Sequence, residues 1–318
     1  MNLFVFEKDQ KVCDVNGVKL GGQPGVNPSV LIGSMFHKGD KLLESRKDSK
    51  FNKEKAREHI KTLEKNMAAT GIPAMIDIVG NTAEELSGYL EFLAAETAMP
   101  LCIDSWQPKV RIEVAKEAAR LKVLDRLVYN SLNPWNPELE AEIDEIAGAG
   151  VRHVVVAVFD DSDKLASGRI KSLERLLPLI EKGGFESIIV DTTVMNVAAM
   201  AFSIQAGFEI KKSFGLPVGC SPANGTYMWK ELRQIASNDG FAGADGAAHG
   251  ISALLWNDFL FYGPMTGTER AFAAAATAES IKAMAAYAES GCLSAAKTHP
   301  VRKLFAKFIE EVESEASK

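Results

Sequence analysis

Six acidic or amide side chains recur where short apolar segments end. They are Asp77, Asp104, Asn130, Asp160, Asp191 and Asn224. An ionised carboxylate accepts hydrogen bonds, whereas an asparagine amide both donates and accepts them. One carboxylate can therefore receive a ring N–H and an exocyclic amino group as a bidentate pair. A site built from such residues suits a neutral heterocycle with an amino-pyrimidine edge.

A simpler explanation exists for each of these residues taken singly. An Asp or Asn at a strand end often caps a helix or forms a turn. Asp160 is followed by Asp161 and Asp163 and fits that explanation well. Asp104 and Asn130 fit it less well, because each lies several residues before the next helical pattern begins. A cap explains one strand end rather than six, so we expect the six side chains to form one site.

Short apolar or β-branched segments position these residues. Eight such segments are predicted as strands, over residues 29–36, 74–80, 101–105, 126–133, 153–160, 187–193, 216–221 and 258–263. Stretches with helical periodicity lie between them, and some carry start signals: Thr82 with Glu85 forms a capping box, and Pro108 suits a first turn. Segments that are apolar on nearly every residue, each followed by an amphipathic helix, predict a parallel sheet covered by helices.

Eight such units predict a single (β/α)8 TIM barrel of the α/β class. We expect one domain over residues 1–318, with an N-terminal hairpin or plug at 1–28, the barrel at 29–295 and a C-terminal helix at 296–318. A doubly wound open sheet is the alternative, but no G-x-G-x-x-G follows the first strand, which disfavours a dinucleotide-binding fold. In TIM barrels the carboxyl ends of the strands hold the active site, so the six residues should line one mouth.

A phosphate-binding barrel is a second possibility for this mouth. The segment "GCSPANG" at 219–225 could supply backbone N–H groups to a phosphate, as the loops after the last strands of such barrels do. A phosphate-substrate isomerase or aldolase therefore stays open, although no strand-end lysine is available for a Schiff base.

Five segments, spread in order over nearly the whole chain, resemble one family. They are "GGQPG" (21–25), "VLIGSMF" (30–36), "YNSLN" (129–133), "VDT" (190–192) and "FYGP" (261–264). Together they are similar to the H subunit of tetrahydromethanopterin S-methyltransferase. They also resemble its bacterial relatives, the methyltetrahydrofolate:corrinoid-protein methyltransferases of the glycine betaine pathway type.

This resemblance implies transfer of a methyl group between N5 of a reduced pterin and the cobalt of a corrinoid. It also implies that Asp104, Asn130 and Asp191 hold the pterin ring, with Asp77 and Asp160 lining the cleft. Asn224 would reach toward N5, so Asn224 and Asp191 are the expected catalytic residues. Because a tertiary amine leaves poorly and no strong acid is well placed, we hypothesise that Asn224 stabilises the N5-protonated form while solvent or a coupled network delivers the proton.

Two departures bear on the choice within this superfamily. Dihydropteroate synthases carry a lysine near the seventh strand and an arginine near the eighth, and "LPVGCSPANG" and "DFLFYGP" have neither. The segment 194–219 lacks the Gly/Ser/Pro-rich run expected of archaeal H subunits. This second departure leaves the choice between tetrahydrofolate and tetrahydromethanopterin open, and we favour tetrahydrofolate.

The corrinoid is expected on a separate protein. The corrinoid signature D-x-H-x-x-G is absent, because "DGAAHG" at 245–250 has the wrong spacing, and the eight units leave no room for a corrinoid domain. A partner should therefore dock over the barrel mouth, where Trp106 and Trp135 either flank the ligand or pack loop against helix. His37, at the end of the first strand, could also enter the site. A non-catalytic barrel that binds a pterin or a partner is the alternative from another class.

Composition limits the remaining possibilities. The 318 residues carry a formal net charge of -6 without a basic stripe, which argues against nucleic-acid binding. The four cysteines are far apart and unpaired with histidine, so neither a disulfide framework nor an intrinsic metal is expected, and a zinc-dependent methyltransferase is disfavoured. The start of the chain becomes charged too soon for a secretory signal, which favours a cytoplasmic protein. The Ala-rich segment 271–288 contains Glu279 and Lys282, which predicts a packed helix and not a membrane span. This helix could also pack against a second copy of the chain and so form a homodimer.

Overall fold

The computed structural model describes residues 2–45 and 49–316 of the chain. Within these residues, eight parallel strands close into a barrel in the order β10-β11-β12-β3-β6-β7-β8-β9. The barrel strands are β3 (Val30–Met35), β6 (Ala74–Val79), β7 (Leu101–Asp104), β8 (Leu127–Leu132), β9 (His153–Ala157), β10 (Ser187–Asp191), β11 (Val218–Cys220) and β12 (Phe259–Pro264). This architecture confirms the predicted TIM-barrel fold.

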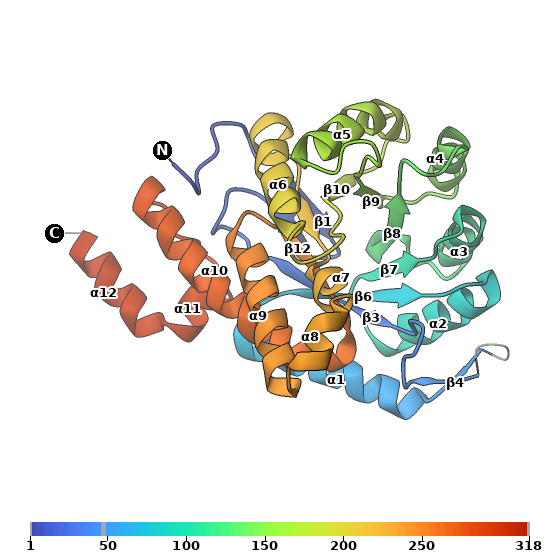
Figure 1. The fold of residues 1–318 in the computed structure, drawn as a ribbon, viewed down its shortest axis with the longest axis horizontal. Coiled ribbons are helices and arrows are strands. Elements are labelled where there is room, and N and C mark those ends of the chain that lie inside the picture. The colour runs from blue at the N-terminus through green and yellow to red at the C-terminus, as the bar shows by residue number, and fades with distance from the viewer. Residues whose placement is uncertain (1, 46–48, 317–318) are drawn as a thin grey trace.

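Helices cover the outside of the barrel (Figure 1). The covering helices are α1 (Lys53–Thr70), α2 (Ala83–Glu96), α3 (Pro108–Arg120), α4 (Leu139–Gly148), α5 (Ala166–Glu181), α6 (Met200–Phe214), α9 (Asn238–Leu254) and α10 (Thr268–Ser290). Two short helices, α7 (Pro222–Tyr227) and α8 (Lys230–Ile235), lie between β11 and α9. A small antiparallel pair, β4 (Leu43–Ser45) and β5 (Lys50–Phe51), precedes α1.

Local sequence signals explain where two of these helices begin. At the start of α2, the Thr82 hydroxyl oxygen accepts a hydrogen bond from the Glu85 N–H at 3.2 Å. The Glu85 carboxylate in turn accepts from the N–H of Asn81 at 2.9 Å, one residue earlier than a capping box predicts. Helix α3 begins at Pro108, whose fixed φ suits the first helical position.

A hairpin near the N-terminus closes one end of the barrel. Strands β1 (Val12–Val15) and β2 (Val18–Gly21) pair antiparallel, within the segment expected to be a hairpin or plug. Cys13, Val15 and Leu20 of this hairpin join one apolar cluster with inward-facing barrel residues. Those barrel residues are Val30, Ile32, Met75, Cys102, Val128, Val155, Ile189, Phe259 and Phe261. The cluster fills the barrel interior below the strand ends, so the opposite end is left for a ligand.

The "GGQPG" segment attaches the N-terminal region to the barrel. Gly21 has a φ of +92°, and a Cβ there would lie 2.3 Å from the Lys11 carbonyl oxygen and 2.7 Å from Pro217. The Gln23 side chain donates to the Phe6 carbonyl at 2.7 Å and accepts from the Phe6 N–H at 3.0 Å. These contacts give the segment a structural role away from the strand ends.

"VLIGSMF" and "FYGP" pack against each other on the adjacent strands β3 and β12. A Cβ on Gly33 would lie only 2.1 Å from the Tyr262 hydroxyl oxygen, so this position requires glycine. The pairing of the two strands shifts register between Phe261 and Gly263, which leaves Tyr262 as an extra residue. The two sequence segments are therefore parts of one packing arrangement.

The C-terminal region lies outside the barrel. The single helix expected over 296–318 is present as two helices, α11 (Pro300–Leu304) and α12 (Ala306–Ala316), and residues 317–318 fall outside the described part. Figure 1 shows α12 on the left, on the same side of the molecule as the N-terminus. Within the described residues, none of the helices combines the length and the apolarity that crossing a bilayer requires.

The Ala-rich helix α10 is largely covered within its own chain. Most of its small residues are buried, among them Ala271, Ala275 and Ala283. They lie in the packed core with the neighbouring elements, so they are not available to a second copy. A homodimer through this helix stays a prediction and would have to use its exposed positions, such as Thr277 and Ile281.

Candidate active site

A cavity of about 670 Å³ opens at the carboxyl-terminal ends of the barrel strands. Strand residues in its lining include Ser34, Asp77, Asp104, Asn130, Ala157 and Asp191, and Asn224 comes from α7. Because all eight strands of the barrel run parallel, their carboxyl ends meet at one rim. The structure thus brings five of the six predicted residues, all except Asp160, to a common cavity.

Strand alternation explains why four of these side chains point inward. Residues two apart on a strand face the same side of a sheet. Each of the four lies two positions after a residue of the apolar cluster that fills the barrel interior. The pairs are Met75–Asp77, Cys102–Asp104, Val128–Asn130 and Ile189–Asp191. The sequence therefore changes from apolar to polar along each inward face at the depth where packing ends and the cavity begins.

Asp77 is the most enclosed carboxylate of the site. It is 2% exposed, and it accepts hydrogen bonds from the Ser34 hydroxyl at 3.0 Å and from the Asn130 amide at 3.2 Å. Burial, and then the nearby charge of Asp104, raise the pKa of Asp77 well above its ordinary value. Asp77 therefore orients Asn130 and keeps a proton to a higher pH than a carboxyl in water.

Asp104 and Asp191 are the other two acidic groups in the cavity. Burial raises the pKa of each to about 6; the charge of Asp191 also raises that of Asp104, while Arg111 opposes the shift. One Asp191 oxygen accepts a hydrogen bond from the Thr193 N–H at 2.8 Å, which fixes its orientation. Near neutral pH both groups are mostly ionised and can accept hydrogen bonds from a ligand.

Asn224 reaches the cavity from α7. Asn224 is exposed, and its side-chain amide makes no hydrogen bond within the described ranges. Helix α7 begins at Pro222 and the Asn224 N–H donates to the Ser221 carbonyl at 3.1 Å. The Asn224 amide is thus held at the edge of the cavity with its hydrogen-bonding capacity free for a ligand.

Helix α7 is tied down from behind by Asp245 of α9. The buried Asp245 carboxylate accepts hydrogen bonds from the Thr226 hydroxyl and, at 2.7 Å, from Arg270 Nε. Arg270 also donates to the Tyr227 hydroxyl at 3.4 Å, and Tyr227 lines the cavity. The segment that carries Asn224 is therefore anchored to both α9 and α10.

Asp160 does not line the cavity in this structure. Its carboxylate accepts from the N–H of Ser162 at 2.9 Å and from the Ser162 hydroxyl at 2.6 Å. These bonds, with a weaker contribution from Arg175, hold the pKa of Asp160 below its ordinary value. This is the turn-forming role that the sequence offered as the alternative for Asp160. Ala157 occupies the corresponding strand end in the cavity.

Several lining residues were not among the six predicted. Ser131 enters because the pairing of β8 with β9 shifts register between Asn130 and Leu132, which makes Ser131 an extra residue in the strand. Arg111 enters from α3, where it is buried, pairs with Glu142 at 2.6 Å and packs over the Tyr129 ring. Ser34 carried a signal in the sequence, as a polar residue late in an apolar run, and His37, Trp106 and Trp135, which the sequence offered as possible site residues, also line the cavity. A helical arginine such as Arg111 carries none.

Two tryptophans stand at the mouth of the cavity. Trp106 is 93% exposed, whereas Trp135 is 47% exposed and its indole N–H donates to Asp161 at 3.2 Å. The Trp135 ring lies 6.1 Å from that of Phe159. Trp135 therefore packs the segment after β8 against the segment after β9 and also lines the cavity, whereas Trp106 projects into solvent.

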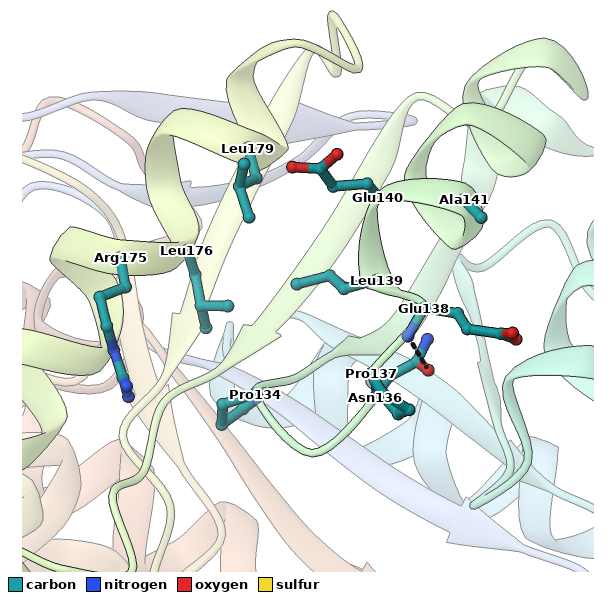
Figure 2. A pocket seen from close by; sticks show the side chains of 10 residues that line it. All are labelled: Pro134, Asn136, Pro137, Glu138, Leu139, Glu140, Ala141, Arg175, Leu176 and Leu179. Atoms are coloured by element: carbon teal, nitrogen blue, oxygen red, sulfur yellow. Dashed lines mark hydrogen bonds between the residues drawn. The ribbon is translucent and has the colours of Figure 1, made fainter.

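A second hollow, of about 440 Å³, lies between the segment before α4 and helix α5 (Figure 2). Leu139 and Leu176 line it, and the polar atoms of Asn136 are used locally, by the N–H of Glu138 at 3.0 Å and by Glu142 at 2.7 Å. None of the strand-end carboxylates lines it; the charged residues in its lining are Glu138, Glu140 and Arg175. In the described residues, no group of three or more His, Cys, Asp or Glu side chains is arranged to hold a metal ion.

Comparisons with known proteins give both a family and a fold. The family model described as the tetrahydromethanopterin S-methyltransferase MtrH subunit matches residues 8–292. The H subunit of that enzyme from Methanothermobacter thermautotrophicus is 33% identical over 288 residues, which cover 87% of this chain and 92% of the relative. Its counterpart from Methanocaldococcus jannaschii is 30% identical over 322 residues, covering 95% of this chain and 100% of the relative.

Solved structures with a similar fold include dihydropteroate synthases. The enzyme from Xanthomonas albilineans aligns with a TM-score of 0.60 at 18% identity, over 87% of this chain and 99% of that chain. The enzyme from Yersinia pestis aligns with a TM-score of 0.62 at 14% identity, over 86% and 100%. At these identities the likeness concerns the barrel fold alone.

Proposed function

Since this chain belongs to the family of the MtrH subunit of tetrahydromethanopterin S-methyltransferase, we propose that it moves a methyl group between N5 of a methylated tetrahydropterin and the cobalt of a corrinoid. The corrinoid is a substrate carried by a separate protein. Membership of this family confirms the resemblance found in the sequence. The observation that supports the activity most directly is the single cavity shared by Asp104, Asn130, Asp191 and Asn224.

The carboxylates at the bottom of the cavity suit the flat head of a pterin. An ionised Asp104 or Asp191 can accept a ring N–H and the exocyclic amino group together. The Asn130 amide, oriented by its bond to Asp77, contributes further donors and acceptors. The same carboxylates would repel a phosphate dianion, which weighs against the isomerase or aldolase alternative.

Asn224 supplies the group that acts at N5. Loss of the methyl group requires N5 to carry positive charge, because an uncharged amine is a better leaving group than an amide anion. The unpartnered Asn224 side chain can hydrogen-bond to protonated N5 and so stabilise it in the transition state. The buried carboxyls of Asp104 and Asp191, with pKa values raised to about 6, line the same cavity and can pass a proton inward from solvent.

The rim of the barrel supports docking of the corrinoid protein over the cavity. Large apolar side chains are exposed in the segments that follow five consecutive strands, from β7 to β11. They are Trp106, Trp135, Leu165, Met195, Met228 and Ile235. Clustered exposed apolar side chains are typical of protein-interaction surfaces. A partner seated on this rim would bring its corrinoid to the open side of the pterin.

The pterin itself is either tetrahydromethanopterin, after which the relatives are named, or tetrahydrofolate. The sequence argument for folate rested on residues 194–219. Among the described residues that line the cavity, none falls within that segment, which forms most of α6 and β11. Residues 194–219 therefore do not contact a pterin in the cavity, and other residues must determine which pterin is bound.

A direct assay tests the activity. The protein is mixed with N5-methyltetrahydrofolate or N5-methyltetrahydromethanopterin and with cob(I)alamin, and methylcobalamin formation is followed by absorbance. We expect transfer from at least one of the two pterins. Pterin binding in calorimetry without any transfer, also when the native corrinoid protein is supplied, would favour the alternative of a non-catalytic binding barrel. Absence of pterin binding would reject the methyltransferase and leave only a barrel that binds a partner protein.

A further inference from the structure

The outer part of the cavity carries charge of the opposite sign to its floor. The floor holds the carboxyl groups of Asp77, Asp104 and Asp191, whereas the lining also includes Lys38, from the loop after β3, and Arg233, from α8. Both cationic residues are exposed. A third cation of the lining, Arg111, is buried and already paired with Glu142. The free cationic groups therefore lie toward solvent.

Arg233 is held in place by aromatic rings. Its guanidinium carbon lies 5.0 Å from the ring centroids of both Tyr227 and Phe241. These two rings contact each other edge to face, with centroids 5.1 Å apart. Within the described ranges Arg233 has no carboxylate partner and makes no side-chain hydrogen bond. Stacking on aromatic faces leaves the N–H edge of a guanidinium open and restricts its motion, which prepares it to bind an anion.

Lys38 is likewise without an ion pair in the described part of the chain. Its neighbour His37 lies 3.9 Å from Asp40 and also lines the cavity. Lys38 follows β3, and Arg233 lies between β11 and α9; β12 is the strand between β3 and β11 in the barrel. The two cations therefore flank the same sector of the rim.

The acidic floor and the cationic outer part of the cavity together complement a ligand whose two ends differ in charge. A head rich in N–H groups fits the carboxylates inside, and an anion fits the cations outside. We propose that Arg233, assisted by Lys38, binds the anionic tail of the tetrahydropterin. This inference rests on the proposed function and adds to it the residue that recognises the end of the substrate remote from N5. The chemistry is shared by two sources, the glutamyl carboxylates of a folate and the phosphate-bearing tail of a methanopterin.

The expected effect is on binding, because the tail is unchanged in the methyl-transfer step. An interaction equally strong in the ground state and the transition state lowers KM without changing kcat. Loss of a charge-assisted hydrogen bond costs about one order of magnitude in affinity. Because Arg233 is exposed, its interaction with the anionic tail should also weaken as the salt concentration is raised.

The test compares ligands with and without a tail. Arg233→Gln keeps a polar side chain but removes the charge, and Arg233→Lys restores a charge without the bidentate fork. Calorimetric titrations use 6-methyltetrahydropterin, which has no tail, tetrahydrofolate, and tetrahydromethanopterin. Arg120→Gln, on the exposed end of α3, is the matched control. We expect Arg233→Gln to bind at least one tailed pterin about tenfold more weakly, to bind the tail-less pterin within about twofold of wild type, and Arg233→Lys to be intermediate.

The results separate this inference from the activity on which it rests. A larger loss with tetrahydrofolate assigns the tail contact to carboxylates, and a larger loss with tetrahydromethanopterin assigns it to phosphate. An equal loss for tailed and tail-less pterins would mean that Arg233 only supports Tyr227, and no loss for any pterin would mean that it touches none; either result overturns the tail contact alone. If wild-type protein fails to bind even the tail-less pterin, the proposed function falls and this inference falls with it.

Discussion

At the scale of single residues, Asn224 differs from the acidic groups around it because its side chain has no partner within the described structure. Asp77, by contrast, is engaged by Ser34 and Asn130, and Asp191 by the backbone of Thr193. A free amide at the cavity edge is suited to a contact made only when the substrate is bound. We therefore assign Asn224 to the chemical step and the carboxylates chiefly to binding.

Asn224→Ala should separate these two roles. We expect the rate of methyl transfer to fall about 10²-fold or more, because a preorganised hydrogen bond to charge that develops at N5 is lost. Pterin affinity should change much less, since the carboxylates that hold the head are untouched. Single-turnover kinetics and a pterin titration measure the two quantities. Near wild-type turnover with unchanged binding would exclude the role of Asn224.

Burying the ionised carboxylate of Asp191 in the cavity should lower the stability of the folded protein. Its pKa is raised to about 6 by burial, so the folded state binds this proton more tightly than the unfolded state does. The free energy of unfolding therefore falls as pH rises from about 4 to 6, and the cost is fully present above pH 6. Asp191→Asn removes it and should stabilise the protein by about 1–3 kcal/mol at pH 8, with no gain at pH 4.

Denaturant unfolding at both pH values measures this difference, and pterin titration should show weaker binding by the same variant. Asp160→Asn is the control with the opposite sign, because the pKa of Asp160 is lowered in the folded state. It should not stabilise the protein at pH 8. A stability change in Asp191→Asn that is the same at both pH values would contradict burial as the cause.

At the scale of elements, α7 is too short to hold its own position and depends on the helices behind it. The buried Asp245 carboxylate joins Thr226 of α7 to Arg270 of α10. His249 is buried beside Asp245, at 3.6 Å, and burial lowers the pKa of His249, which disfavours a charge there. This network sets where Asn224 stands relative to the carboxylates on the strands.

Thr226→Val tests that dependence with little change in volume. Loss of the hydroxyl removes one bond to a buried carboxylate and should cost about 1–3 kcal/mol of stability. We also expect the methyl-transfer rate to fall while the affinity for a tail-less pterin stays close to wild type, because only the α7 contact is displaced. Thr277→Val, on the exposed side of α10, is the control. If both variants behave alike in rate and stability, α7 is positioned by other contacts.

At the scale of the whole molecule, the barrel divides its interior into two parts. The N-terminal hairpin and the apolar cluster fill one end, and the cavity occupies the other. Trp106, Trp135, Leu165, Met195, Met228 and Ile235 are exposed on segments that surround the cavity, as a docking surface for a second protein would require. Helices α11 and α12 lie outside the barrel and contribute nothing to the cavity lining in the described residues.

Replacing two rim residues should weaken the partner without touching the pterin. Leu165 and Ile235 are 53% and 82% exposed, and neither lines the cavity. We expect the double variant Leu165→Ser/Ile235→Ser to raise KM for the corrinoid protein severalfold while the rate with free cob(I)alamin stays unchanged. Steady-state kinetics with the two acceptors measure this. An unchanged KM for the protein acceptor would place the docking surface elsewhere.

The sequence by itself determined the barrel and most of its site. Each strand is short, apolar and followed by a helical pattern, and these are local properties that specify a strand and helix without knowledge of distant contacts. The change from Met75 to Asp77, or from Cys102 to Asp104, is equally local, because residues two apart share a face. Parallel strands then bring their ends together, so the gathering of these residues could be predicted from the order of elements alone.

Only the tertiary structure decided which polar residues face the cavity and in what state. Asp160 lies past the end of β9, where its carboxylate accepts a hydrogen bond from the Ser162 N–H and does not line the cavity. The sequence alone could not decide between a turn and a cavity position for this residue. Arg233 enters from a helix and owes its place to rings contributed by α7 and α9. Burial, which raises the pKa of Asp191, depends on every element that excludes water from the site. Such properties arise from contacts between distant segments, and no short stretch of sequence encodes them.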